Sequence, residues 1–385
     1  MKKIAIVLDN KINRWALQRF EPLKTDIDIT VFVGERNDYD VKSIDLNKRQ
    51  LTHAEEIILA MREPLTAYKR IINAPYKKMD FYYFSLKKYL DGMDMVYSCD
   101  ISRSAYTLAS LKDELGFKFI LSWWENIPFR AVFDEKTAFH KRLVMDKVDL
   151  FLPFTKMAKE VLKLEDVPEE KIEVIYPGVD MERFKPGKKP EHLLAKNNIP
   201  VNSFVILYVG KLVSWKGVHN LVYAARILKQ RGVKDFIVAV AGKGAQKENM
   251  EKLIKESGTE DNFRFLDFVS YDDMPEVYRM ADVFVLPSYP TMAWQEQFGM
   301  VLIEALASGK PVISTMSGGI PEVIGDAGIL IPSGDYFKLA ENILELFKDD
   351  NLRDALCKKA LERAWELYDA RKNGIQFKGI LENRL

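Results

Sequence analysis

Cysteine and histidine are both scarce in this chain of 385 residues, which contains two cysteines and four histidines. Cys99 and Cys357 are too few and too far apart in sequence to indicate a disulfide framework or a zinc site. No histidine has a spacing typical of a catalytic or metal-binding motif. We therefore expect all four to be structural or solvated: His53, His140, His192 and His219.

An excess of charge of one sign is also missing, because 57 Lys and Arg residues nearly balance 56 Asp and Glu residues. This balance argues against a nucleic-acid-binding protein. The apolar run after Met1-Lys2-Lys3 has only five residues, fewer than the core of a signal peptide, and no run is long enough to span a bilayer. We expect a cytoplasmic protein, with any membrane contact being peripheral on the inner face of the membrane.

The overall composition, with 48% hydrophobic and 29% charged residues, is typical of a globular protein. A chain of 385 residues exceeds what one hydrophobic core usually supports, so two domains are expected. Prolines and glycines within the charged stretch 176–190 mark a linker, which we place at 179–189.

Apolar, β-rich runs alternate with helical patterns along both halves of the chain. Helical patterns such as 102–115, closed by Gly116, and 155–164 separate most of the runs. This alternation predicts an α/β protein with two parallel sheets, each covered by helices on both faces. The predicted strands are 3–9, 27–33, 95–98, 118–123, 150–153 and 172–176 in the first half, and 205–209, 237–241, 263–268, 283–286, 312–314 and 329–331 in the second.

Two glutamates eight residues apart, Glu296 and Glu304, lie between a predicted strand ending near Pro287 and another beginning at Pro311. One carboxylate is then in a loop at the carboxyl end of a strand, and the other is in a helix that begins near Gly299. Ligands of doubly wound sheets bind at these strand ends, where helix N-termini offer free N–H groups. A carboxylate at each end of the opening suits a ligand with hydroxyls at both ends and a phosphate between them, as in a nucleotide sugar.

This stretch resembles the donor-site signature of retaining GT-B glycosyltransferases of the family-4 (glycosyl transferases group 1) type. The resemblance covers nearly all of residues 200–335 and is much weaker before residue 150. It implies the GT-B fold, with two Rossmann-like doubly wound domains facing each other across a cleft. Its further segments are Val209-Gly210-Lys211-Leu212-Val213-Ser214-Trp215-Lys216-Gly217, Ala241-Gly242-Lys243-Gly244, Phe265-Leu266-Asp267-Phe268-Val269, Met274-Pro275-Glu276-Val277-Tyr278, Ala281-Asp282-Val283-Phe284-Val285-Leu286-Pro287-Ser288, Gly318-Gly319-Ile320-Pro321-Glu322 and Gly328-Ile329-Leu330.

The resemblance also implies a division of the chain. An N-terminal acceptor domain would span 1–178, and a tail at 372–385 would cross back to it. The donor domain would span 190–371. The donor would be a UDP-, GDP- or ADP-linked sugar, with no further cofactor, and the acceptor a sugar, a glycan or a lipid, as in polysaccharide or glycolipid biosynthesis.

Lys211 and Lys216 lie in a glycine-bounded loop after a predicted strand, and we predict that both contact the diphosphate. The family pattern usually has arginine at the first position. Lys211 keeps the charge but loses the bidentate fork. With no Asp-x-Asp pair placed as a metal clamp, the lysines are expected to neutralise the leaving group without a metal. Gly242 and Gly244 indicate either a tight turn or a phosphate contact.

By the same resemblance, the main chain at Val269 contacts the base and Glu304 accepts hydrogen bonds from the ribose. Glu296 contacts hydroxyls of the donor sugar, beside the N–H groups of Phe298 and Gly299 and the start of a helix at Met300. The catalytic residues are then Glu296, Lys216 and Lys211. Retention is explained in this family by a front-face mechanism in which the diphosphate helps to take the acceptor proton.

The N-terminal half departs from the family pattern. Glu125 and Asn126 stand where many relatives have a histidine, and they either contact the donor or the acceptor, or Glu125 caps the following turn. Interleaved basic and aromatic residues at 68–90 suit an anionic membrane surface, although packing of the aromatics into the core, with the lysines solvated, is the favoured alternative. Alternatives to transfer are a nucleotide-sugar epimerase, a disaccharide synthase or a non-catalytic nucleotide-sugar-binding partner.

Overall fold

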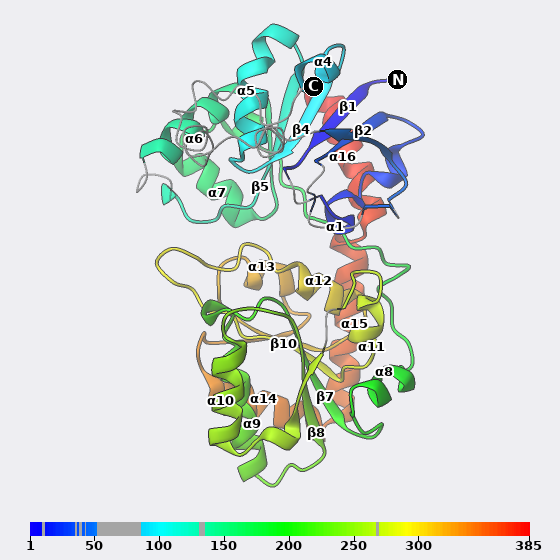
Figure 1. Ribbon diagram of the computed structural model, residues 1–385, viewed down its shortest axis with the longest axis vertical. Coiled ribbons are helices and arrows are strands. Elements are labelled where there is room, and N and C mark those ends of the chain that lie inside the picture. Colours follow the sequence, from blue (N-terminus) through cyan, green and yellow to red (C-terminus); the bar gives the residue numbers. More distant parts are fainter. Residues whose placement is uncertain are drawn as a thin grey trace, which may run out of the picture. The chain divides into compact units, whose positions relative to one another are not determined.

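A computed structural model of the chain (Figure 1) describes residues 1–9, 12–34, 37, 41–42, 44–51, 86–130, 135–266 and 269–385. The chain forms two compact units. One consists of Met1–Pro177 with Arg371–Leu385, and the other of Gly178–Ala370. Most of the 68–90 segment that suggests membrane contact lies outside the described residues. Only its end is described, as helix α4 (Leu86–Leu90).

The first unit contains a six-stranded sheet in the order β3-β2-β1-β4-β5-β6, and every neighbouring pair is parallel. The predicted strands are confirmed except the last, 172–176. In that segment Ile172 forms an isolated bridge with Phe151, and the N–H of Ile175 still donates to the carbonyl of Pro153 at 3.1 Å. Pro153 has no N–H to donate in return, so the ladder does not continue as a strand. The strands are β1 (Lys3–Val7), β2 (Asp28–Gly34), β3 (Asn47–Leu51), β4 (Met95–Cys99), β5 (Lys118–Trp123) and β6 (Leu150–Pro153).

The unpredicted strand β3 has the sequence Asn-Lys-Arg-Gln-Leu, with four exposed residues followed by one buried leucine. It lies at the edge of the sheet, where polar and charged residues protect the open ladder from other chains. A strand of this kind carries no hydrophobic pattern for sequence reasoning to detect.

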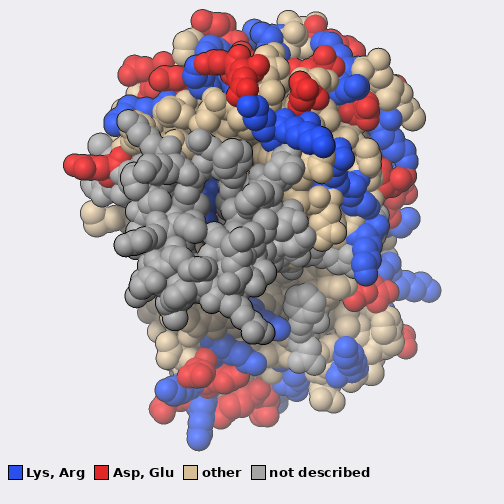
Figure 2. Space-filling model, turned by 45° about the horizontal axis from the view of Figure 1, so that its top comes forward, with Lys and Arg blue, Asp and Glu red and all other residues tan. Residues whose placement is uncertain are grey.

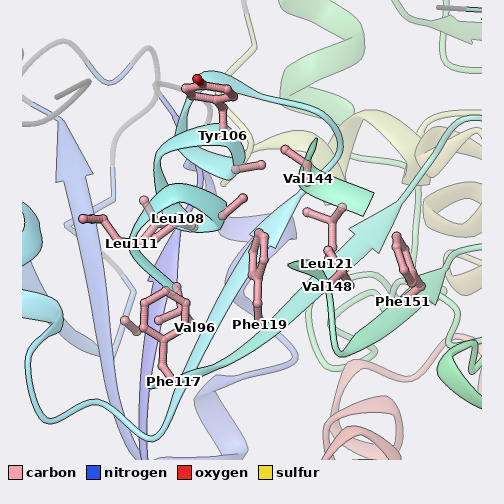
Figure 3. Close-up of a cluster of buried hydrophobic side chains, with 14 of the residues drawn as sticks. Val96, Tyr106, Leu108, Leu111, Phe117, Phe119, Leu121, Val144, Val148 and Phe151 are labelled. Atoms are coloured by element: carbon pink, nitrogen blue, oxygen red, sulfur yellow. The ribbon is translucent and has the colours of Figure 1, made fainter. Parts of the chain in front are cut away.

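Apolar side chains from the strands and the covering helices form the core on each face of this sheet. On one face, shown in Figure 3, Phe119 and Leu121 of β5 pack with Leu108 of α5. On the other face Phe377 of α16 packs edge-on against Phe20, 5.2 Å between ring centroids. The helices of this unit, besides α4, are α1 (Arg14–Leu17), η1 (Glu21–Leu23), α5 (Arg103–Leu115), α6 (Glu135–Lys147), α7 (Lys156–Leu164), η4 (Glu169–Lys171) and α16 (Ala370–Arg384).

The second unit also contains a parallel six-stranded sheet, in the order β12-β11-β10-β7-β8-β9. All six strands predicted for this half are confirmed, with shifts at their ends. The strand order reverses between β7 and β10, so the connections leave this point toward opposite edges of the sheet. The strands are β7 (Phe204–Val209), β8 (Phe236–Ala241), β9 (Phe263–Leu266), β10 (Val283–Leu286), β11 (Val312–Thr315) and β12 (Ile329–Ile331).

Helices cover this sheet as well; α9 contacts α10 and α14, and α12 contacts α15 (Figure 1). They are α8 (Glu191–Lys196), η5 (Ser214–Lys216), α9 (Val218–Gln230), α10 (Lys247–Ser257), η6 (Glu260–Asn262), α11 (Met274–Arg279), α12 (Met300–Ala307), α13 (Ile320–Ile324), α14 (Tyr336–Lys348) and α15 (Asp350–Leu367). Among the described residues, no helix combines the length and the apolar character needed to cross a bilayer.

Residues 179–189, the predicted linker, group with the second unit. Phe184 is fully buried and packs against the ring of Tyr278, 5.8 Å away. Lys189 pairs with Asp282 at 2.5 Å. These contacts anchor the segment to one sheet.

Candidate functional site

The switch point of the second sheet, between β7 and β10, brings together two loops that are far apart in sequence. The loop after β7 contains η5 and ends with Lys216. The loop after β10 carries Glu296 and leads into α12. Crevices at such points are where open α/β sheets bind their ligands.

Lys216 and Glu296 form an ion pair at this point, with 2.6 Å between Nζ and Oε2. Both side chains are largely buried, being 18% and 7% exposed. Ser288 donates a hydrogen bond to the same carboxylate oxygen at 2.9 Å, and the ring of Trp294 lies 5.1 Å from the ammonium. A buried carboxylate with two donors is fixed in direction.

Hydrogen bonds between the loop after β11 and the backbone of Glu296 hold this residue in place. Its carbonyl accepts a hydrogen bond from the N–H of Gly319 at 2.8 Å, and its own N–H donates to Ser317 Oγ at 3.4 Å. Three loops that follow the adjacent strands β7, β10 and β11 therefore converge on this one residue.

Gly217 ends the Lys216 loop and begins α9 in a conformation that requires glycine. Its φ is +68°, and a Cβ at this position would lie 1.9 Å from the carbonyl oxygen of Pro287. The two loops that carry the ion pair thus approach each other with no room for a side chain.

Gly299 is the N-cap of α12, with φ of +87°. The preceding Phe298 is fully buried and packs edge-on against Tyr368. Met300 begins the helix and is partly exposed. The predicted N–H donors at 298 and 299 therefore lie at the N-terminus of a helix that starts four residues after Glu296.

Lys211 differs from Lys216 because its side chain is exposed and, within the described residues, has no ion-pair partner. Its carbonyl accepts a hydrogen bond from the Tyr208 hydroxyl at 2.8 Å. Burial, with a smaller contribution from the charge of Glu296, raises the pKa of Tyr208 above its usual range, so the phenol remains a donor. The two lysines predicted to contact the diphosphate thus differ: Lys216 is ion-paired, whereas Lys211 is exposed to solvent.

Glu304 is 4% exposed, and its carboxyl accepts a hydrogen bond from the Tyr278 hydroxyl of α11 at 2.7 Å. Burial raises the pKa of Glu304 to about 7, against opposing contributions from Tyr278, Tyr271 and the charge of Arg183. The two glutamates of the motif are therefore unlike: Glu296 is ion-paired, whereas Glu304 can titrate near neutral pH.

The glycines after β8 bring two backbones close together. A Cβ on Gly242 would lie 1.9 Å from the carbonyl oxygen of Gly210, and one on Gly244 would lie 2.3 Å from that of Leu212. These contacts support a structural role in fitting the β8 loop against the β7 loop. Val269 is partly buried and directly follows two residues outside the described set, so its predicted contact with a base remains a prediction.

In the first unit, Glu125 makes the local contacts of a turn cap. Its carboxylate accepts from the N–H of Ile127 at 3.1 Å and pairs with Arg130 at 3.0 Å. Asn126 is 3% exposed. These contacts agree with the alternative in which Glu125 caps the following turn. Contact of Glu125 or Asn126 with the donor or the acceptor remains a prediction.

Sequence reasoning missed three contributors: Ser288, Tyr278 and Trp294. Ser288 and Tyr278 occur in segments that match the family signature, but neither side chain was assigned a role. No local signal links Tyr278 to Glu304, 26 residues later. In the described part of the chain, no group of three or more His, Cys, Asp or Glu residues is arranged to hold a metal ion.

Two parallel six-stranded sheets with flanking helices define the GT-B fold, an architecture of glycosyltransferases. Residues 190–363 match the family described as "Glycosyl transferases group 1". This match spans the converging loops and both glutamates.

Two curated relatives are similar to part of the chain. The D-inositol 3-phosphate glycosyltransferase of Corynebacterium kroppenstedtii is 32% identical over 232 residues, which are 57% of this chain and 50% of the relative. That of Mycolicibacterium smegmatis is 31% identical over 242 residues, 62% of this chain and 52% of the relative. The chain therefore spans about half the length of these relatives.

Two solved structures share the fold over the whole chain. Anabaena Alr3699/HepE in complex with UDP has a TM-score of 0.76 at 18% identity and covers 100% of both chains. Sucrose-phosphate synthase from Thermosynechococcus elongatus has a TM-score of 0.74 at 20% identity, covering 100% of this chain and 99% of the other. At these identities the likeness shows the fold alone.

Proposed function

We propose that this protein is a retaining glycosyltransferase that moves a hexose from a nucleotide diphosphate sugar to a sugar, glycan or lipid-linked acceptor. The observation that carries the proposal is the buried pair of Lys216 and Glu296 at the switch point of the second sheet. The match of residues 190–363 to the glycosyltransferase family supports it. The complexes of HepE with UDP and with UDP-glucose show that a protein of this fold holds such a donor.

In this proposal Lys216 and Lys211 neutralise the diphosphate together with the N-terminus of α12. An ammonium has three donor hydrogens, so Lys216 can keep Glu296 while it binds a phosphate oxygen. Exposed Lys211 adds a second cation without first breaking an ion pair. Glu296 then presents its remaining acceptor sites to hydroxyls of the sugar.

Glu304 would meet the ribose at the other end of the donor. Its carboxyl is already held by the Tyr278 hydroxyl, so one oxygen is oriented before any ligand binds. A ribose hydroxyl donates best to the ionised carboxylate, because a charged acceptor gives the stronger hydrogen bond. Binding at Glu304 would therefore favour loss of its proton.

In the transfer step the bond from the anomeric carbon to the β-phosphate oxygen breaks, and its electron pair leaves with the diphosphate. The acceptor hydroxyl oxygen bonds to the anomeric carbon on the same face, and its proton passes to a phosphate oxygen. The lysines stabilise the negative charge that develops on the leaving group. No covalent bond to the protein is needed.

A thermal-shift screen of the full chain tests the proposal. UDP-glucose, GDP-mannose and ADP-glucose would each be added at increasing concentration, because a ligand of the folded state raises the melting temperature by mass action. We expect at least one to raise it, and to raise it less in Lys216→Ala. Equal melting temperatures with and without all three donors would contradict the proposal.

A further inference from the structure

A cavity opens in the second unit beside the loops of the candidate site. Its volume is about 490 Å³, within the range of small-molecule sites. It lies between the beginnings of α9 and α14, which pack side by side (Figure 1), and the loop after β10. We call it the aromatic cavity, lined by His219, Asn220, Tyr223, Tyr289, Pro290, Ser333, Gly334 and Tyr336.

Aromatic rings form a connected surface around this cavity. The ring of His219 lies 5.9 Å from those of both Tyr223 and Tyr289. Tyr223 lies 4.9 Å from Tyr336, which in turn lies 4.8 Å from the exposed Phe337. Tyr223 and Phe337 are exposed. The other three rings are partly buried, so all five keep surface that a ligand can contact.

Polar groups in the aromatic cavity are uncharged. The hydroxyl oxygen of Ser333 is buried and has no hydrogen-bond partner within the described part of the chain. Asn220 adds an amide, and burial lowers the pKa of His219, so the imidazole is neutral at physiological pH. A buried hydroxyl without a partner costs stability unless a ligand or a water completes it.

We propose that the aromatic cavity binds a neutral saccharide, which stacks on Tyr223 and Tyr336 and donates a hydrogen bond to Ser333. Pyranose rings present C–H groups on one face, which pack on the electron-rich face of an aromatic ring, and hydroxyls at their edges. The cavity supplies both kinds of contact and no charge. A phosphate or a carboxylate would find no cation among the lining residues.

The place of the cavity links it to the candidate site. His219 lies three residues after Lys216, and Tyr289 follows Ser288, which holds Glu296. The N–H of Tyr289 also donates to the carbonyl of Trp215 at 2.9 Å. A saccharide in the aromatic cavity would thus lie against the same two loops that carry the ion pair, without using the ion pair itself.

Saturation-transfer NMR on the full chain tests the assignment, with neutral trisaccharides of glucose, mannose and galactose as probes. Trigalacturonic acid serves as the anionic comparison. We expect at least one neutral trisaccharide to bind, and saturating UDP to leave it bound. Displacement by UDP, stronger binding of trigalacturonic acid, or no binding of any neutral probe would overturn the proposal.

Two variants and a matched control locate the site. Ser333→Ala removes a hydroxyl that has no hydrogen-bond partner among the described residues, so the fold should be as stable as the wild type, yet affinity should fall about three- to tenfold. Tyr223→Ala should weaken binding at least about fivefold. Trp365→Ala removes a similarly exposed ring outside the cavity and should change nothing. Unchanged affinity in both Ser333→Ala and Tyr223→Ala would refute the site even if a saccharide binds.

The binding measurement needs no transfer, so it is independent of the proposed function. If the chain binds neutral trisaccharides but no nucleotide sugar, the saccharide site stands and the proposed transferase function is refuted. If it binds a nucleotide sugar but no neutral trisaccharide, the proposed function stands and the saccharide site is refuted.

Discussion

The ammonium of Lys216 lies 2.6 Å from the carboxylate of Glu296, a residue 80 positions later in the chain. The pair joins the loops after two adjacent strands, β7 and β10. A ligand that binds beside this pair would meet a cation and an anion whose positions are already fixed, which reduces the entropy lost on binding.

Glu296→Gln should lower turnover and leave binding of the nucleoside diphosphate largely intact. The amide keeps the shape of the side chain but loses a charged acceptor, which is worth about 1.5–3 kcal/mol. Turnover would be followed as release of nucleoside diphosphate from the donor, and binding by calorimetry. Glu304→Ala, at the proposed ribose end, should instead weaken nucleoside diphosphate binding. Equal loss of binding in the two variants would remove the assignment of sugar to one glutamate and ribose to the other.

The stability of the protein should depend on the titration of Glu304. Its pKa rises from 4.5 to about 7 on folding. The protonated carboxyl is therefore favoured in the folded state, and this contribution is fully present below pH 4.5 and is lost as the pH rises through 7. The loss amounts to no more than about 3 kcal/mol.

Glu304→Gln provides the control, because an amide does not titrate. Urea unfolding of both proteins at pH 5 and pH 8 should show the wild type losing stability relative to the variant at the higher pH. A difference between the two proteins that stays constant with pH would show that Glu304 has the same proton affinity folded and unfolded.

Gly217→Ala should destabilise the second unit by more than about 2 kcal/mol, since a Cβ would meet the carbonyl oxygen of Pro287 and the φ is positive. Gly232→Ala is the matched control. Its φ is +82°, but a Cβ there would have nothing within 4 Å, so only the backbone strain of about 1 kcal/mol applies. Denaturant midpoints measure both. Similar midpoints for the two variants would contradict the prediction, because they would mean that the loops carrying Gly217 and Pro287 move apart at little cost to accept the added methyl group.

Transfer or donor hydrolysis should proceed in the presence of EDTA, because in the proposed function lysines and a helix N-terminus would take the place of a metal at the diphosphate. Activity would be measured after exhaustive chelation and again after addition of magnesium or manganese. Complete loss on chelation with full recovery on adding the metal contradicts this prediction, whereas a modest stimulation does not.

The sequence predicted most of the fold because its strands are buried on both faces and read as continuous apolar runs, as in Phe204–Val209. It missed Asn47–Leu51, whose polar residues suit an edge, and it predicted a strand at 172–176, where only an isolated bridge at Ile172 forms. The candidate site was predictable where it lies within one loop, as at Glu296. It was not predictable where residues meet through the fold, as Tyr278 and Glu304 do, since periodicity carries no information about contacts between elements.

The net charge of the chain indicates little about its function. Figure 2 shows both acidic and basic side chains on the described part of one face, as the near balance of the whole sequence leads one to expect. The informative charges are few and, apart from the exposed Lys211, largely buried; their spacing within a motif indicates them, whereas composition does not.

Phe377 of α16, packed against Phe20 at the start of the chain, makes the first unit discontinuous in sequence. The second unit, Gly178–Ala370, is one uninterrupted segment. During synthesis on the ribosome, the second unit has all of its residues before the first can bury Phe20 against Phe377. Until residues 371–385 emerge, the part of this face that α16 covers stays open to water, so the unit that is begun first is completed last.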